Sequence, residues 1–213
     1  MPRRDELTMA VPKDRLLEPF AERLSARGID CTPLLTSSRR LFVKDPKSRL
    51  SFILTRSADV ATFVEHGAAD LGVIGENVLL EQGKRVAVLA DLGFGRCSLV
   101  VAVPDGSPIR TVQDFDFNSR VATKYPNITA RYFGEHGIQV EVVPLSGSVE
   151  LAPLVGLADA IVDVTETGRT LAENGLRKIA TIAESSARLV ANTVSLRVHF
   201  ARIHALAEAL KAT

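Results

Sequence analysis

Residues 162–171 have the sequence Val-Asp-Val-Thr-Glu-Thr-Gly-Arg-Thr-Leu, and this stretch decides the fold. An apolar run, Leu157 to Val162, precedes it, and a helix-like segment, Leu171 to Asn174, follows it. The pattern predicts a strand, then a turn rich in acids, hydroxyls and glycine, and then the start of a helix. Such a strand–turn–helix unit is typical of a parallel α/β sheet.

The same turn carries groups that suit a phosphoribosyl ligand. A helix start offers backbone N–H groups and the positive end of its dipole to a phosphate. The three threonine hydroxyls can donate to phosphate oxygens, and Gly168 lets the backbone approach closely. Because carboxylates repel phosphate, Asp163 and Glu166 fit ribose hydroxyls or a magnesium ion instead. An ordinary βα turn capped by Thr167 has the same local pattern, so both interpretations remain open at this point.

Length and charge exclude several classes of protein. The chain has 213 residues, enough for one large domain or two small ones, with 26 basic and 25 acidic residues. This balance gives no global field for nucleic acid or membrane binding. The two cysteines, Cys31 and Cys97, form neither a disulfide framework nor a metal-ligand spacing. The N-terminus lacks the apolar core of a signal peptide and no run reaches membrane-spanning length, so we expect a cytoplasmic protein.

Strand-like and helix-like segments alternate along the chain, which predicts an α/β fold. Short apolar runs predict strands at Leu7 to Val11, Leu50 to Leu54, Asp70 to Ile74, Val86 to Ala90, Leu99 to Val103, Arg120 to Thr123, Val140 to Val143, Ala160 to Val164, Lys178 to Ile182 and Arg188 to Ala191. Amphipathic segments predict helices at Arg15 to Arg27, Ala58 to His66 (with Ser57 as its cap), Asn127 to His136, Val149 to Leu157 and Leu196 to Leu210.

We expect two α/β lobes, although composition alone does not prove the division. The chain is predicted to cross near Gly95 and to return near Glu184, so residues 1–95 with 185–213 form lobe I and residues 96–184 form lobe II. Ligands of open α/β sheets bind beyond the carboxyl ends of the strands, which predicts a site in the cleft between the lobes. The turn at 163–171 lies at such an end, and so do Lys13 and Arg15.

Five collinear blocks then resemble a known family. These are Ser37 to Leu41, Glu65 to Gly75, Ala122 to Asn127, Gly147 to Gly156, and Ala158 to Asp163 running into the Thr-Gly-Arg-Thr-Leu turn. Together they resemble ATP phosphoribosyltransferase over most of the chain. The resemblance implies the two-lobed fold of periplasmic binding proteins. It also implies transfer of the phosphoribosyl group of phosphoribosyl diphosphate to N1 of ATP, with release of pyrophosphate, as the first step of histidine biosynthesis.

The resemblance further implies partners and cofactors. The chain is similar to the short, catalytic form of the family, which works with a regulatory subunit resembling histidyl-tRNA synthetase, typically in a hetero-octamer. A homodimer of the catalytic chain is also implied. Mg²⁺ is expected together with the substrate phosphates, and no protein metal site, nucleic acid or membrane is expected.

Site residues follow from the matched motifs. Glu166, Thr167, Gly168, Arg169, Thr170 and Leu171 would cradle the 5′-phosphate, and Asp163 with Glu166 would hold the ribose hydroxyls. Lys13 and Arg15 would meet the pyrophosphate, as would Arg39, in this case across a dimer interface. Arg15 and Arg39 are the catalytic candidates, because a fixed guanidinium binds two phosphate oxygens at once. Arg56 and Asp70 are further candidates for nucleotide or pyrophosphate contacts.

One residue departs from the family pattern. Asp14 stands between Lys13 and Arg15 where the family usually has glycine. It would lower the affinity for phosphoribosyl diphosphate if its charge faced the pyrophosphate, or it would cap the following helix if it faced away.

Three other functions remain alternatives. They are a solute-binding protein of the same fold, a nucleobase phosphoribosyltransferase, and a catalytically weak paralogue that serves as an interaction subunit. Solute-binding proteins of this type carry a signal peptide, and salvage enzymes often place two adjacent acids before the turn. In this chain two residues separate Asp163 from Glu166.

Overall fold

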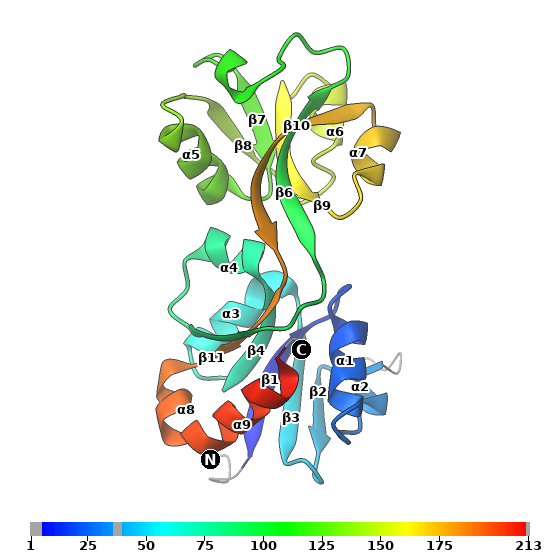
Figure 1. The fold of residues 1–213 in the computed structure, drawn as a ribbon, viewed down its shortest axis with the longest axis vertical. Helices are drawn as coiled ribbons and strands as arrows, with labels where there is room; N and C mark the ends of the chain where they lie inside the picture. The colour runs from blue at the N-terminus through cyan, green and yellow to red at the C-terminus, as the bar shows by residue number, and fades with distance from the viewer. Residues whose placement is uncertain (1–5, 36–39, 212–213) are drawn as a thin grey trace. The chain divides into compact units, whose positions relative to one another are not determined.

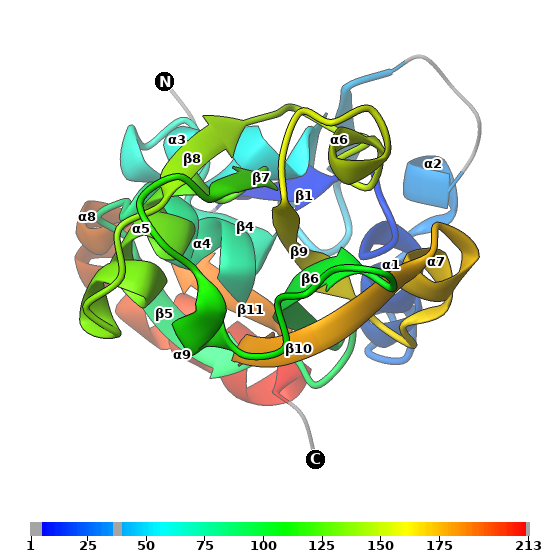
Figure 2. The same ribbon diagram turned by 90° about the horizontal axis from the view of Figure 1, so that it is seen from above.

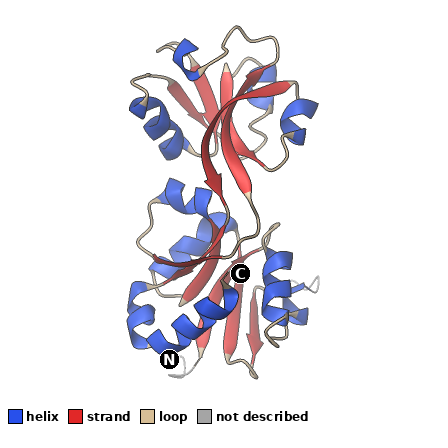
Figure 3. Cartoon of the chain, viewed as in Figure 1, coloured by secondary structure: helices blue, strands red, loops and turns tan. Residues whose placement is uncertain are grey.

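The computed structural model describes residues 6–35 and 40–211, which form two compact units. Unit 1 contains the described residues up to Leu79, Gly83–Gly95, and those from Ser186 onward. Unit 2 contains Arg96–Ser185 together with the short piece Leu80–Gln82. Each unit has one β-sheet with helices on both faces (Figures 1 and 3).

The sheet of unit 1 has six strands in the order β2-β3-β1-β4-β11-β5. Their bounds are β1 Leu7–Pro12, β2 Phe42–Asp45, β3 Leu50–Thr55, β4 Leu71–Gly75, β5 Ala87–Asp91 and β11 Ala187–Ala191. β1 pairs in parallel with β3 and β4, whereas β2 and β11 run antiparallel to their neighbours. β11 therefore lies between β4 and β5, although about one hundred residues of sequence separate it from both.

Helices cover both faces of this sheet. Their bounds are α1 Leu17–Ser25, α2 Thr32–Leu35, α3 Ser57–Glu65, α4 Glu76–Gln82, α8 Thr193–Val198 and α9 Phe200–Leu210. One face packs against α1 and α9, through fully buried residues such as Phe20 and Ile203. The other face packs against α3 through Val60 and Val64. Adjacent strand residues such as Met9 and Ala10 point to opposite faces, so the parallel strands are buried on both sides.

Unit 2 has five strands in the order β10-β6-β9-β7-β8. Their bounds are β6 Cys97–Pro104, β7 Arg120–Thr123, β8 Glu141–Pro144, β9 Ala160–Thr165 and β10 Leu176–Ser185. β9, β7 and β8 are parallel, and β6 is antiparallel to β9 and β10. The helices are η1 Val112–Asp114, α5 Pro126–Glu135, α6 Leu151–Leu154 and α7 Arg169–Glu173. α5 lies on one side of the sheet, and α6 and α7 lie on the other (Figures 1 and 2).

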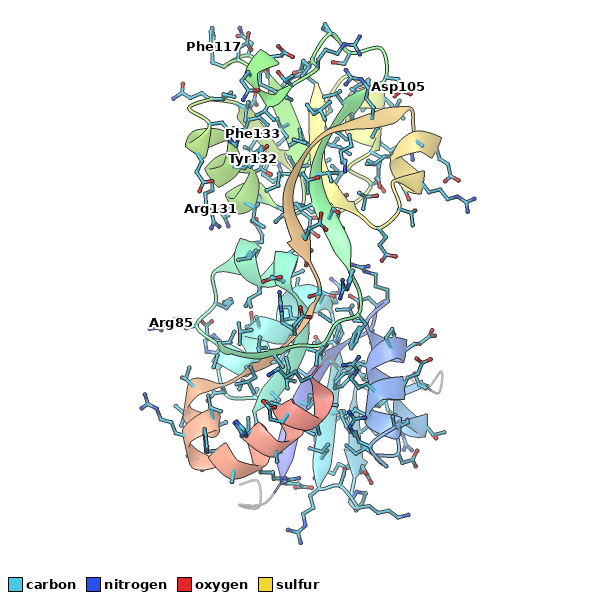
Figure 4. The ribbon with its side chains drawn as sticks, in the orientation of Figure 1. Arg85, Asp105, Phe117, Arg131, Tyr132 and Phe133 are labelled. Atoms are coloured by element: carbon cyan, nitrogen blue, oxygen red, sulfur yellow. The ribbon has the colours of Figure 1, made fainter. Side chains whose placement is uncertain are left out.

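Aromatic packing fixes α5 on its face of the sheet. Phe133 is 1% exposed, and its ring meets Phe115 edge-to-face with centroids 5.1 Å apart. Tyr132, the preceding residue, makes a second edge contact with Phe133 at 5.6 Å (Figure 4). Offset and edge-to-face geometries of this kind are the favoured arrangements of aromatic pairs.

The structure confirms the predicted α/β alternation and corrects several boundaries. The predicted terminal helix is broken at His199 into α8 and α9, and the helix predicted from Val149 shortens to α6. Strand β2 and helix α4 were not predicted. Ser57 is the first residue of α3 and does not cap it, because Arg56 holds the N-cap position. The hydroxyl of Ser57 donates to the carboxylate of Asp14. In the part of the chain that the structure describes, no helix is long and apolar enough to cross a bilayer.

Gly72 on β4 offers a test of the packing between β4 and α3. A Cβ at this position would lie 2.7 Å from Cγ2 of Val64 and 2.8 Å from Cγ1 of Val60. We expect Gly72→Ala to lower the free energy of unfolding by about 1–3 kcal/mol, because this core is already filled. Urea denaturation followed by circular dichroism measures the change.

Gly134 is the matched control for this substitution. It lies on an exposed part of α5 with open space around an added Cβ, so Gly134→Ala should stabilise by about 0.5–1 kcal/mol. Equal effects of the two substitutions would contradict the assigned packing of β4.

Candidate functional site

The carboxyl ends of three parallel strands define one edge of the unit 2 sheet. Thr123, the last residue of β7, pairs with Val162 of β9 and with Pro144 of β8. The loops that follow these strands carry Lys124, the segment from Leu145 to Glu150, and the turn after Thr165. In a doubly wound sheet this edge is where ligands bind.

The turn after β9 has the geometry that its sequence predicts. Gly168 has a left-handed backbone, with φ of +78°, and α7 begins at the next residue. The hydroxyl of Thr165 accepts a hydrogen bond from the N–H of Gly168 at 2.9 Å, and that of Thr167 accepts from Arg169 at 3.4 Å. A hydroxyl that accepts in this way keeps its own proton, so both can still donate to a ligand oxygen.

The side chains of two residues of the turn interact elsewhere in unit 2. The Arg169 side chain is 82% exposed and pairs with Glu173 on the same helix, with Nε 2.7 Å from Oε1. The Leu171 side chain packs in the core with Val100 and Ala102 and is 6% exposed. Only the backbone of Leu171 can therefore contribute to an anion site, which narrows the role predicted from the motif.

Asp163 is the charged group at the end of the buried part of β9. Burial raises the pKa of its carboxyl, and the negative charge of Glu150 acts in the same direction. Two interactions oppose the rise, namely the N–H of Val164, which donates to Oδ1 at 2.8 Å, and the positive charge of Lys124. A carboxylate held among partly desolvated groups is a common sign of a ligand site.

Lys124 and Glu150 were not among the residues predicted for the site. Lys124 could have been predicted, because it directly follows the buried strand β7. β7 is parallel to β9, so both strands end at the same edge of the sheet. Glu150 lies two residues after Ser148, a non-glycine residue with φ of +50°. Such backbone is strained, and strain of this kind concentrates at functional loops.

Unit 1 brings a second set of predicted residues together. β1 and β3 are parallel, with Pro12 opposite Thr55, so Lys13 and Arg56 follow neighbouring strand ends. The N–H of Lys13 donates to the carbonyl of Thr55 at 2.8 Å, which fixes the two loops against each other. Lys13, Arg15 and Arg56 are all exposed at this edge, where they can meet an anion.

Asp14 is exposed, and its carboxylate binds two groups of the chain itself. Its carboxylate accepts from the N–H of Leu16 at 2.9 Å, just before α1, and from the hydroxyl of Ser57. The N-cap residue of α1 is Leu16 and no side chain caps this helix, so the bond from Leu16 to Asp14 belongs to the turn that precedes it. The contact with Ser57 also links the loops that carry Lys13 and Arg56.

Asp70 is not brought together with these basic residues. Its carboxylate accepts from the N–H of Thr8 at 2.8 Å and from the hydroxyl of Ser195 at 2.6 Å. It precedes β4, at the amino end of the parallel strands, roughly 16 Å along the strand direction from Lys13. Asp70 therefore ties β1 to α8 and lies apart from the basic residues, and the nucleotide contact predicted for it stays a prediction. Arg39 lies outside the described residues.

Within residues 6–35 and 40–211, no three His, Cys, Asp or Glu side chains are grouped to hold an ion. Mg²⁺ in nucleotide sites is held mostly by substrate phosphates, with one or two protein carboxylates. The carboxylates of Asp163 and Glu166 fit that secondary role.

Comparison with known proteins identifies the family of the chain. The family model described as ATP phosphoribosyltransferase (HisG) matches residues 56–212. The ATP phosphoribosyltransferase of Syntrophotalea carbinolica is 48% identical over 200 residues, which cover 93% of this chain and 91% of that protein.

Comparison with solved structures gives the same family and fold. The ATP phosphoribosyl transferase (HisG:HisZ) complex from Thermotoga maritima contains a similar chain, with 35% identity, a TM-score of 0.81 and 96% of both chains covered. The periplasmic aliphatic sulphonate binding protein of Escherichia coli is 16% identical with a TM-score of 0.66, over 97% of this chain and 67% of that one. This second likeness shows the fold alone, and it confirms the predicted two-lobed α/β class. The chain belongs to the ATP phosphoribosyltransferase family, whose members catalyse the first step of histidine biosynthesis.

Proposed function

We propose that this transferase binds the phosphoribosyl end of its donor at the carboxyl edge of the unit 2 sheet. The observation that carries the proposal is the placement of Asp163 near the end of β9, two residues before the turn Thr165–Thr170 begins. Asp163 and Glu166 hold the ribose hydroxyls, and the hydroxyls and N–H groups of Thr167, Gly168, Arg169 and Thr170 hold the 5′-phosphate. Leu171 contributes its N–H only.

The reaction needs positioning and charge stabilisation more than a nucleophile from the protein. N1 of the adenine ring attacks C1 of the ribose with its own lone pair, and the bond from C1 to the pyrophosphate oxygen breaks. Positive charge develops on the ribose and negative charge on the departing pyrophosphate. Fixed cationic groups that meet the developing anion supply the catalysis.

Lys13, Arg15 and Arg56 are the groups that we assign to pyrophosphate and nucleotide phosphates. Their support is the shared edge at the ends of β1 and β3 and the backbone bond between Lys13 and Thr55. Arg15 is the catalytic candidate among them, because a planar guanidinium can bind two oxygens of the leaving group. Arg39 has the same proposed role, donated across a dimer interface.

We assign Mg²⁺ to the substrate phosphates. When bound, the ion neutralises part of the diphosphate charge and orients it. Asp163 and Glu166 are the protein carboxylates that would complete its shell, and both retain their proposed hydrogen bonds to ribose.

The assembly proposed for this chain follows its relatives. The similar Thermotoga maritima protein is part of a HisG:HisZ complex. We propose that this chain is likewise the short, catalytic form and binds a regulatory subunit similar to histidyl-tRNA synthetase, in a hetero-octamer built on catalytic homodimers. We place it in the cytoplasm, and we propose residues 1–95 with 185–213 and residues 96–184 as its two lobes.

The direct test is an assay of the purified chain with ATP, phosphoribosyl diphosphate and MgCl₂, with and without the HisZ-type partner. We expect phosphoribosyl-ATP and pyrophosphate in equal amounts, measured by chromatography and by a coupled pyrophosphatase assay. A product that lacks the adenine–ribose bond at N1, or no product in the presence of the partner, would contradict the proposed function.

Asp163→Asn tests the ribose contact. We expect kcat/KM for phosphoribosyl diphosphate to fall about 100-fold, as for loss of one preorganised electrostatic contact, while the KM for ATP changes little. The same substitution should raise the Tm at neutral pH. Because burial raises the pKa of Asp163, its ionisation destabilises the folded state.

The gain in Tm expected for Asp163→Asn depends on pH. Below the ordinary aspartate pKa the carboxyl is protonated in both the folded and the unfolded state, so it adds no destabilisation. The destabilisation develops as the pH rises through the raised folded-state pKa. The Tm difference between Asp163→Asn and wild type should therefore shrink on acidification, and a difference that grows at low pH would refute the assignment.

Arg15→Lys tests whether the planar fork matters at the pyrophosphate. The charge is kept but bidentate binding is lost, so we expect kcat to fall about tenfold or more. Steady-state kinetics with both substrates measure the change. Arg197→Lys is the matched control, because Arg197 is an exposed residue of α8, and it should leave the kinetics unchanged. Equal kinetics for both variants would remove Arg15 from the site.

A further inference from the structure

Thr123 joins the ends of three strands in unit 2. It is the last residue of β7 and is completely buried. Its hydroxyl donates to the carbonyl of Val162 on β9 at 2.7 Å, and its own carbonyl accepts from the N–H of Leu145, just after β8, at 2.9 Å. The hydroxyl also accepts from the N–H of Tyr125 at 2.9 Å.

These bonds hold the backbone segments that carry Asp163, which is assigned to the ribose, and Lys124, whose positive charge acts on Asp163. Val162 directly precedes Asp163, so the hydroxyl fixes the backbone from which that carboxylate projects. Lys124 lies between Thr123 and Tyr125, so the second bond closes the turn that carries the lysine. Lys124 and Asp163 interact electrostatically, and their separation depends on where these two backbone segments lie.

The hydroxyl of Thr123 can hold both backbone segments at once, which the methyl group of a valine cannot do. A threonine hydroxyl has one proton and two lone pairs. The proton serves the carbonyl of Val162 and one lone pair serves the N–H of Tyr125, so a valine of nearly the same shape removes one hydrogen bond from each of these two backbone groups. Because a buried backbone group that loses a hydrogen bond raises the free energy of the folded state, the backbone shifts to bring that group to another partner or to water.

We infer that Thr123 is a positioning residue of the phosphoribosyl site, whose hydroxyl sets the placement of Asp163 relative to Lys124. The inference rests on the proposed assignment of Asp163 to ribose. Thr123 itself touches no substrate, because it is fully buried. Its effect is on the binding and orientation of the phosphoribosyl donor, and the ATP end of the reaction does not depend on it.

Thr129 provides a matched control. It is also a completely buried threonine in unit 2. Its hydroxyl donates to the carbonyl of Tyr125, the N-cap residue of α5, at 2.7 Å and lies at the longer distance of 3.3 Å from the Thr123 hydroxyl. Thr129→Val thus replaces the same hydroxyl by a methyl group inside unit 2. It keeps the two bonds that the Thr123 hydroxyl makes with Val162 and Tyr125.

The experiment compares Thr123→Val, Thr123→Ser and Thr129→Val by steady-state kinetics, each well below its own Tm. We expect Thr123→Val to lower kcat/KM for phosphoribosyl diphosphate roughly 10- to 100-fold, with the KM for ATP unchanged. Thr123→Ser keeps the hydroxyl and should recover most of the loss, and Thr129→Val should resemble wild type. If Thr123→Val does not fold, Thr123→Ala, which leaves room for a water, takes its place.

Several outcomes would overturn the inference. One is a Thr123→Val enzyme with a lower Tm but wild-type kinetics, and another is an equal loss in Thr129→Val or no recovery in Thr123→Ser. Failure of wild type to make phosphoribosyl-ATP would instead refute the proposed function. In that event, a carbon-detected NMR titration of the Asp163 carboxyl decides: a pKa change in Thr123→Val alone supports the positioning role, and no change refutes it.

Discussion

Unit 2 depends on the burial of β9 between β6 and β7. Residues Ala160 to Val162 are completely buried, because one helical layer covers each face of the sheet and a strand lies on each side. Asp163 is the point at which this strand begins to leave the core. Its carboxyl is therefore partly desolvated by the same packing that holds the strand, and the site inherits its electrostatic character from the fold.

The larger part of the fold could be predicted from the sequence because central strands are apolar on both faces. Runs such as Leu99 to Val103 and Arg120 to Thr123 correspond closely to β6 and β7. β2 was not predicted because it has no apolar run: it is an edge strand without a buried residue, and two of its four residues are Lys44 and Asp45. Helix boundaries were less predictable, since α8 and α9 are separated only by a change of direction at His199.

The candidate site was predictable where its chemistry is local. The turn after β9 carries its hydroxyls, glycine and acids in consecutive positions, so its strand–turn–helix geometry follows from the sequence. The partners of Asp163 come from other strands, and their approach depends on register, which a single sequence does not contain. The partners of Asp70, Thr8 and Ser195, are also distant from it in the sequence, so these contacts could not be predicted from the sequence either.

The order of strands in unit 1 also constrains the synthesis of the protein. β11 lies between β4 and β5, so the six-stranded sheet stays open until residues 187–191 have left the ribosome. All residues of unit 2 precede that point in the chain. All of unit 2, which carries the proposed phosphoribosyl site, is therefore synthesised while unit 1 still lacks an inner strand. During that interval β4 and β5 lack their shared neighbour, and these are the strand edges that a chaperone would need to shield.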